Sequence, residues 1–261
     1  MGKKQHLKLK KILVTIAWSG IVLGLMVVMG FVNHTRKQTK CSGIIINMDY
    51  SDGLFFIDED DVRNHIYKVH GDLIGEPLKT INIANLESEL TKMNAVKKAD
   101  VFAGLKGDVF VEITQRKPIA RVFMTDGKGG YIDETGEWMN LSGKFTARVI
   151  VINGNLPQWS ENINVADKAS KWGQLYFLTQ TIRSDAFLNA QFEQVYVKKD
   201  GDIVLIPRVG RHSILLGNTE GLNKKFAKLK LFYKEGIAKV DWNKYKQIDL
   251  RYKDQVVCTK R

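Results

Sequence analysis

The stretch MNAVKKADVFAGLKGDVFVEITQRKPIARV, residues 93–122, decides how this 261-residue chain folds. Its runs of apolar and β-branched residues at 96–102 and 108–114 predict two strands. The glycine-bounded segment 104–107 between them predicts a hairpin turn. From Gln115 onward the chain changes character, because short strand-like runs now alternate with glycine-containing turns. The stretch therefore holds the end of one structural unit and the start of another.

A strand and two helices are predicted before this hairpin. Residues 43–50 contain three successive isoleucines and predict the strand. Asp58 begins an acidic cluster that invites a calcium loop, but an EF-type loop needs oxygens at alternating positions and a glycine at the sixth. That pattern is absent, so Asp58 is predicted to cap a helix whose first turn carries the other acids. A second helix is predicted over 81–93, with Asn82 or Asn85 as its cap.

The two helices have buried stripes at helical spacing, namely Val62, Ile66 and Val69 in the first and Leu86, Leu90 and Met93 in the second. A strand, two helices and two further strands in about 75 residues form a recognisable supersecondary order. The sequence therefore predicts a compact α+β unit with two helices on one face of a three-stranded sheet.

The rest of the chain predicts a mixed β-sheet domain with flanking helices. Strand candidates lie at residues 119–124, 130–133, 137–140, 148–152, 193–198, 202–207, 211–216, 245–252 and 255–259. Helices are predicted over 167–183 and 219–236, the second capped by Thr219. In that helix Leu222, Phe226, Leu229 and Tyr233 are expected to face inward, and Lys224, Lys225, Lys228 and Lys234 are expected to form a solvated face.

An uncharged apolar segment, ILVTIAWSGIVLGLMVVMGFV, covers residues 12–32. At about 1.5 Å per residue it extends roughly 31 Å as a helix, which is enough to cross the hydrocarbon core of a bilayer. A cleaved signal peptide is the alternative, but it has a shorter apolar region followed by a small-x-small cleavage site. Because neither feature is present, we expect an uncleaved single-pass anchor, with the basic N-terminus in the cytoplasm and the remainder translocated.

These features divide the chain into five expected segments. They are a basic tail over 1–11, a transmembrane helix over 12–32, a linker over 33–40, the α+β unit over 41–115 and the β domain over 116–261.

The formal net charge of +12 is distributed unevenly. Residues 1–40 contain eight Lys or Arg and no acid, residues 41–199 carry a net −3, and residues 200–261 carry a net +7. Most of the excess therefore flanks the apolar segment. Since the sequence also has no zinc-knuckle spacing and no aromatic-basic run, it argues against a nucleic-acid partner.

The translocated part contains no recognised catalytic motif: GxSxG, HExxH, Walker A, CxxC and GxGxxG are all absent. The enzyme alternative is a cysteine transpeptidase resembling the sortases, with His212 and Arg261 converging on a Cys258 thiolate. Cys258 is more simply a small apolar residue of a strand. We therefore expect no enzyme activity, cofactor, metal or small-molecule substrate, and a disulfide between Cys41 and Cys258 stays open.

The last strand-like stretch, KQIDLRYKDQVV at residues 246–257, is two-faced. Its alternation predicts that Ile248, Leu250 and Tyr252 anchor the strand on the body of the domain. The same alternation leaves Asp249, Arg251 and Lys253 free to meet a partner. An edge strand can accept a partner segment through its unpaired backbone groups. The partner-binding candidates are therefore Ile248, Asp249, Leu250, Arg251, Tyr252, Lys253, Gln255, Val256 and Val257.

Four stretches, in this order behind an apolar anchor, resemble one family. They are 93–122, quoted above; GYIDETGEWMN at 130–140; VINGN at 151–155; and IDLRY at 248–252. Together they resemble the bacterial cell-division proteins FtsQ and DivIB, whose first extracytoplasmic unit is a POTRA domain. The resemblance covers some 220 residues and implies an α+β chain with a transmembrane helix, a POTRA-like βααββ unit and a β domain.

The resemblance also implies a function. It indicates a scaffold of the divisome in the inner membrane, with the bulk of the chain in the periplasm and enriched at the septum. Its implied partners are FtsB- and FtsL-like proteins, and it would link early to late division proteins in septal peptidoglycan synthesis. The alternative, from a different class, is a membrane-anchored POTRA protein acting as a chaperone or secretion component.

Overall fold

The structure, a computed structural model, describes residues 18–27, 39–160, 163–236 and 243–261. The chain divides into two units. The first contains the described residues up to Asp49 together with Asp58–Thr114. The second contains Tyr50–Ile57 and the described residues from Gln115 to the C-terminus.

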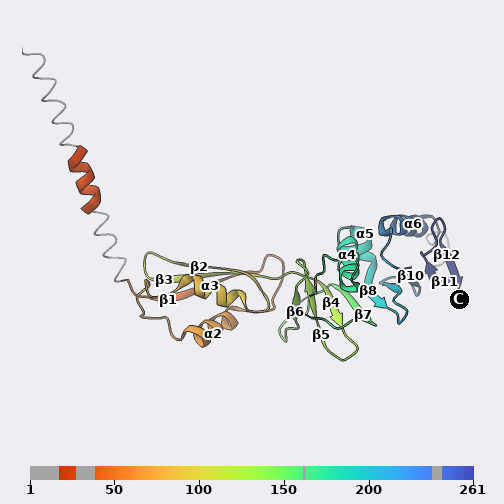
Figure 1. Cartoon of the computed structure of the whole chain (residues 1–261), viewed down its shortest axis with the longest axis horizontal. Helices are drawn as coiled ribbons and strands as arrows, with labels where there is room; N and C mark the ends of the chain where they lie inside the picture. Colours follow the sequence, from red (N-terminus) through yellow and green to blue (C-terminus); the bar gives the residue numbers. More distant parts are fainter. Residues whose placement is uncertain (1–17, 28–38, 161–162, 237–242) are drawn as a thin grey trace, which may run out of the picture. The chain divides into compact units, whose positions relative to one another are not determined.

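The first unit has the predicted order of one strand, two helices and two strands (Figure 1). Its elements are β1 (Gly43–Asp49), α2 (Glu59–His70), α3 (Ile83–Thr91), β2 (Val96–Ala103) and β3 (Asp108–Gln115). The strands form a sheet in the order β1-β3-β2, in which β1 runs parallel to β3. Val62, Ile66, Leu86 and Leu90 of the two helices are buried, so the α+β prediction for this unit is confirmed.

Local chemistry sets where α2 begins. The Asp58 carboxylate accepts a hydrogen bond from the Asp61 backbone N–H at 3.1 Å, and the Asp61 carboxylate accepts one from the Asp58 N–H at 3.0 Å. This reciprocal capping satisfies two helix-end donors and confirms Asp58 as the N-cap. The Asn82 side chain caps α3 by accepting a single hydrogen bond from the Asn85 backbone N–H at 3.1 Å. The prediction that Val69 is buried was wrong, because the helix ends one residue later and Val69 is 41% exposed.

The second unit contains one mixed nine-stranded sheet in the order β12-β11-β10-β9-β8-β7-β4-β5-β6. The strands are β4 (Pro118–Phe123), β5 (Gly129–Asp133), β6 (Trp138–Asn140), β7 (Ile150–Gly154), β8 (Phe192–Val197), β9 (Ile203–Pro207), β10 (Ser213–Gly217), β11 (Tyr245–Asp249) and β12 (Val257–Lys260). The β4–β7, β7–β8 and β10–β11 pairs are parallel, and the other pairs in the sheet are antiparallel. The prediction of a mixed sheet is confirmed.

Three helices of this unit lie along one face of the sheet (Figure 1), namely α4 (Lys171–Arg183), α5 (Ala186–Gln191) and α6 (Leu222–Glu235). Their buried side chains join one hydrophobic core with those of the strands. The inward stripe predicted for α6 is confirmed, because Leu222, Phe226, Leu229 and Tyr233 are all buried.

The predicted starts of the two longer helices were too early. Ser170 caps α4 by accepting a hydrogen bond from the Gly173 N–H at 3.0 Å, so the helix starts at Lys171 and not at residue 167. Gly221 precedes α6 in a left-handed conformation with φ of +62°, which ends the preceding turn; Thr219 is therefore not the cap. The short helix α5 was not predicted.

The segment Tyr50–Ile57 belongs to the second unit although it lies between β1 and α2 in sequence. The buried Gln115 side chain accepts hydrogen bonds from the Phe56 N–H at 2.9 Å and the Ile57 N–H at 3.3 Å, and donates one to the Leu54 carbonyl at 2.9 Å. The Phe56 ring packs edge-to-face on Tyr131, with ring centroids 5.4 Å apart. One buried amide side chain therefore satisfies three backbone groups of this segment.

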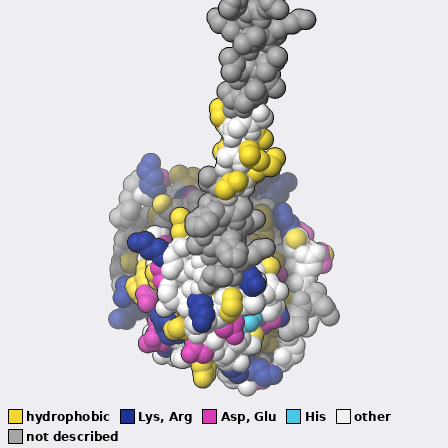
Figure 2. All heavy atoms as spheres, turned by 90° about the vertical axis from the view of Figure 1, so that its left-hand side faces the viewer, with side chains coloured by type: hydrophobic (Ala, Val, Ile, Leu, Met, Phe, Trp, Pro, Cys, Tyr) yellow, Lys and Arg dark blue, Asp and Glu magenta, His cyan; other side chains and the backbone are white. Residues whose placement is uncertain are grey.

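Residues 18–27 form a helix whose side chains are all exposed (Figure 2). Within the described parts of the chain, no helix combines the length and the apolar composition that a bilayer crossing requires. The predicted transmembrane helix at 12–32 extends on both sides into residues outside the described ranges, as do the predicted tail at 1–11 and most of the linker at 33–40.

Candidate partner-binding surface

The C-terminal strands form the terminal hairpin of the nine-stranded sheet. β11 pairs in parallel with β10, and its Ile248 lies opposite Ile214. On its other side β11 pairs antiparallel with β12, so that Ile248 also lies opposite Cys258. β12 is the last strand at this end of the sheet among the described residues. Its outer backbone N–H and C=O groups therefore form an edge that another strand can extend.

The two-faced stretch 246–257 does not form one long strand. It ends as a strand at Asp249, bends over residues 252–254, and resumes at Val257. Ile248 and Leu250 are fully buried, as the alternation predicts. The prediction that Tyr252 anchors the strand was wrong, because Tyr252 lies in the bend and is 47% exposed.

Asp249 and Arg251 were predicted to be free for a partner, but they pair with each other. The Arg251 Nη2 lies 2.8 Å from Asp249 Oδ2, and its Nε lies 3.1 Å from Oδ1 of the same carboxylate. The Arg251 Nη1 donates a further hydrogen bond to Asp202 at 3.0 Å. Arg251 thus connects the end of β11 to the turn before β9, and a partner that uses this guanidinium must compete with two internal carboxylates.

The ion pair changes the titration of both groups. Burial raises the pKa of Asp249, but the hydrogen bonds from the Arg251 side chain and backbone outweigh burial and hold that pKa below its ordinary value. The same hydrogen bonds to Asp249 raise the pKa of Arg251. Both groups are therefore charged at neutral pH.

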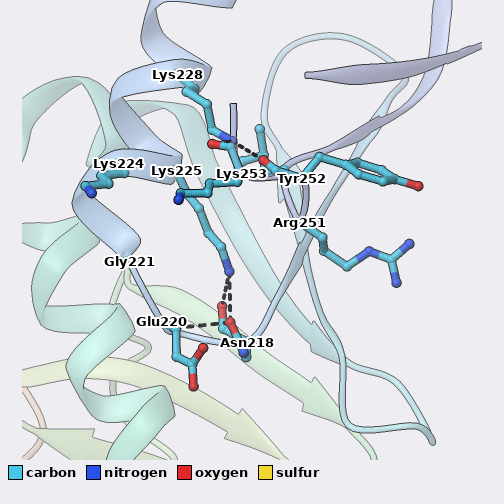
Figure 3. A pocket seen from close by; sticks show the side chains of 10 residues that line it. Asn218, Glu220, Gly221, Lys224, Lys225, Lys228, Arg251, Tyr252 and Lys253 are labelled. Carbon is cyan, nitrogen blue, oxygen red and sulfur yellow. Dashed lines mark hydrogen bonds between the residues drawn. The ribbon is translucent and has the colours of Figure 1, made fainter. Parts of the chain in front are cut away.

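Two lysines of α6 bind backbone carbonyls, and one of them, Lys228, holds the bend, although the sequence predicted that both would lie on a solvated face. Lys228 Nζ donates hydrogen bonds to the carbonyl oxygens of Tyr252, of Lys253 at 3.1 Å and of Gln255 at 3.4 Å. Figure 3 shows Lys228 reaching this backbone from the helix. No sequence signal identifies this role, because the acceptors are main-chain carbonyls whose position depends on the tertiary fold.

Lys225 performs a similar task at the start of α6. Its Nζ donates to the Leu216 carbonyl at 3.0 Å. It also donates to the carbonyl and side-chain oxygens of Asn218 at 2.8 and 2.9 Å (Figure 3). Burial lowers the pKa of Lys225. The lysine is therefore a structural cation that joins the end of β10 to the helix.

A cavity of about 300 Å³ lies between the first turns of α6 and the bend after β11. Five basic side chains and one acidic side chain line it, together with uncharged residues: Lys224, Lys225, Lys228, Arg251 and Lys253, with Glu220 as the acid. Neither Lys224 nor Lys253 forms an ion pair within the described part of the chain, and both are exposed. These two ammonium groups give the cavity a positive rim, which suits a carboxylate of a bound segment.

The other predicted candidates lie around the edge itself. Gln255 and Val257 are exposed and Val256 is half-buried, so these residues lead the chain into β12. The structure therefore divides the residues predicted from sequence into four groups, namely the buried anchors, the internal ion pair, the exposed bend residues Tyr252 and Lys253, and the approach to the edge.

The geometry disfavours the cysteine transpeptidase alternative. Burial raises the pKa of the Cys258 thiol, whereas a nucleophilic cysteine needs a lowered pKa. His212 is buried, and its Nε2 lies 2.7 Å from the Tyr233 hydroxyl. The Arg261 guanidinium donates to the Arg211 carbonyl.

Comparison with known families assigns both units. Residues 117–259, which are more than half of the chain, match the family described as FtsQ/DivIB, C-terminal related. Residues 39–114 match the POTRA-like domain. A search of curated proteins finds no match to the chain.

Proposed function

The chain belongs to the FtsQ/DivIB, C-terminal related family, and on this premise we propose that it is a bitopic scaffold of the bacterial division machinery. In this role it binds FtsB- and FtsL-like proteins through its extracytoplasmic domain and links early division proteins to those of septal peptidoglycan synthesis. The POTRA-like match over 39–114 supports the proposal, because it reproduces the two-unit order of the family.

The proposed location is the bacterial inner membrane, with enrichment at the septum. The uncharged segment 12–32 supports a single crossing, and the lysines before it support a cytoplasmic N-terminus. A fluorescent fusion to the N-terminus of the full chain tests the location in growing cells. Mid-cell enrichment is expected, whereas even staining around the envelope would contradict a division role and favour the chaperone or secretion alternative.

The proposed mode of docking is strand addition to β12. The observation that carries this proposal is the position of β12 as the terminal strand of the described sheet. A partner segment in an extended conformation completes the ladder through main-chain hydrogen bonds, and contacts with side chains set specificity. Gln255 and Val257 lie at the start of this edge, while buried Ile248 and Leu250 hold the hairpin to the core.

The charge of the neighbouring cavity specifies the partner further. Lys224 and Lys253 are exposed on its rim, and the lining contains one acid, Glu220. We propose that an acidic side chain next to the added strand pairs with these ammonium groups. The internal pairing of Arg251 with Asp249 and Asp202 makes Arg251 the secondary contact in this scheme.

Charge reversal at the rim tests this docking. An exposed ion pair contributes about 0.2–1 kcal/mol, so the double variant K224E/K253E, which also adds repulsion, is expected to weaken binding of an acidic FtsB-like peptide about five- to thirtyfold. The matched control is K234E, which reverses an exposed lysine in the last turn of the same helix. Fluorescence anisotropy with the labelled peptide measures both. Equal affinity of K224E/K253E and K234E, with unchanged melting curves, would rule out this surface as the docking site.

A further inference from the structure

A second cavity, of about 210 Å³, lies in the second unit at the starting ends of two parallel strands. Pro118 begins β4 and Ile150 begins β7, and the two strands pair side by side. The end of α4 and part of α5 close the other side of the cavity. It shares no lining residue with the cavity beside the C-terminal bend.

Two arginines from different elements line this cavity. Arg148 lies just before β7, and Arg183 is the last residue of α4. Both side chains are exposed, and neither forms a hydrogen bond or ion pair with the residues that the structure describes. In the same unit, by contrast, Arg251 is paired with acids. Two guanidinium groups without an internal partner therefore line one small cavity.

The acids close to this cavity in the structure are already engaged. The lining contains no acidic residue. Asp133 lies opposite Pro118 in the sheet, but it pairs with Arg116. Asp185 follows Arg183 by two residues, but it pairs with Lys230, whose hydrogen bond lowers the pKa of Asp185. Neither arginine is thus neutralised by a neighbouring carboxylate.

The helix dipole explains the position of only one of the two arginines. A positive side chain is favoured at the C-terminal end of a helix, which explains Arg183. Arg148 follows no helix and has no such reason to lie there. An anion held by both guanidinium groups would satisfy several N–H donors at once.

We propose that this cavity binds a small anionic ligand, carrying a carboxylate or a phosphate group, between Arg148 and Arg183. The planar guanidinium fork matches both groups in geometry. Asn189 of α5 lines the same cavity and offers an amide donor, and Ile119 and Ile182 supply apolar wall for a short carbon chain. This site does not depend on the proposed division role.

Isothermal titration of the full chain in detergent, in a buffer of low ionic strength, tests the site with two probes, inorganic phosphate and succinate. At least one probe is expected to bind saturably. R148Q and R183Q are each expected to weaken that binding about tenfold or more, because each removes charge-assisted hydrogen bonds. R148K keeps the charge but loses the planar guanidinium group, so its affinity for the probe is expected to lie between that of R148Q and that of the unaltered chain. The matched control is R63Q, which removes an exposed arginine of α2 in the other unit.

The two probes distinguish the source of the anionic group. Saturable binding of phosphate alone supports a phosphate ligand, and binding of succinate alone supports a carboxylate ligand. Melting curves of each variant confirm that it is folded. Absence of saturable binding by both probes, or equal affinity in R148Q, R183Q and R63Q, would overturn the proposal.

Discussion

The ion pairs of Arg251 make a contribution to stability that one substitution is expected to remove. Arg251→Ala deletes its hydrogen bonds to Asp249 and Asp202. A hydrogen bond to a charged group contributes about 1.5–3 kcal/mol. Because the Arg251 side chain is 46% exposed, solvent screening reduces the expected loss at pH 7 to about 1–2 kcal/mol. For a domain of this size the Tm is expected to fall by about 2–8 °C.

The loss is expected to depend on pH through Asp249. In the native chain the pKa of Asp249 is lowered, so its contribution is present above the unfolded pKa of about 3.9 and is lost as the pH falls through the lower folded value. In the R251A variant the side-chain hydrogen bonds and the positive charge that lower the pKa of Asp249 are lost, while burial and the backbone hydrogen bond remain, so the charged carboxylate is stabilised less at neutral pH. The Tm difference between the two chains is therefore expected to be largest near pH 7 and to shrink as the pH approaches about 3.

Thermal unfolding of the full chain, followed by circular dichroism at about pH 7 and about pH 3, measures the difference. The matched control is Lys253→Ala, which removes an exposed charge two residues away and is expected to change stability by less than about 0.5 kcal/mol. The reasoning is refuted if R251A and K253A have the same Tm at neutral pH. It is equally refuted if the R251A deficit stays constant down to the acidic condition.

Two further predictions concern the same hairpin. Lys228→Met removes the donor to three backbone carbonyls of the segment 252–255, so the amides of residues 253–257 are expected to exchange hydrogen faster, while exchange in α2 serves as the internal reference. Unchanged exchange at residues 253–257 would contradict the role given to Lys228. Leu250→Ala is expected to lower the free energy of unfolding by about 2–5 kcal/mol because Leu250 is fully buried. Tyr252→Ala is expected to lower it by less than about 0.5 kcal/mol because Tyr252 is 47% exposed. Similar losses for both variants in denaturant titrations would contradict the assignment of Leu250 as the anchor.

The local features of the fold were predictable because their causes lie within a few residues of each other. The capping carboxylates of Asp58 and Asp61 are three residues apart. The buried stripe of α6 follows from 3.6-residue spacing, which needs only one apolar side to the helix. The mixed sheet and the α+β class followed from the order of such elements.

The candidate site was predictable only in part. Burial of Ile248 and Leu250 followed from the alternation of residues 246–257, but the strand stops at Asp249. The Asp249 carboxylate accepts the Arg251 backbone N–H at 3.0 Å, a local bond that favours a turn. Lys228 then holds the bend from α6, which is distant in sequence. The alternation of apolar and charged residues along a strand carries no information about a contact with a distant helix.

By itself, the sequence determined the class of each unit, the anchors Ile248 and Leu250, and the resemblance that the family match confirms. Only the tertiary structure decided which residues are available to a partner. It paired Arg251 with Asp249 and Asp202, directed Lys225 and Lys228 to backbone carbonyls, and left β12 at the end of the described sheet. The physical reason is that burial follows from local periodicity, whereas pairing of a charge depends on which groups of distant segments come within about 3 Å of it.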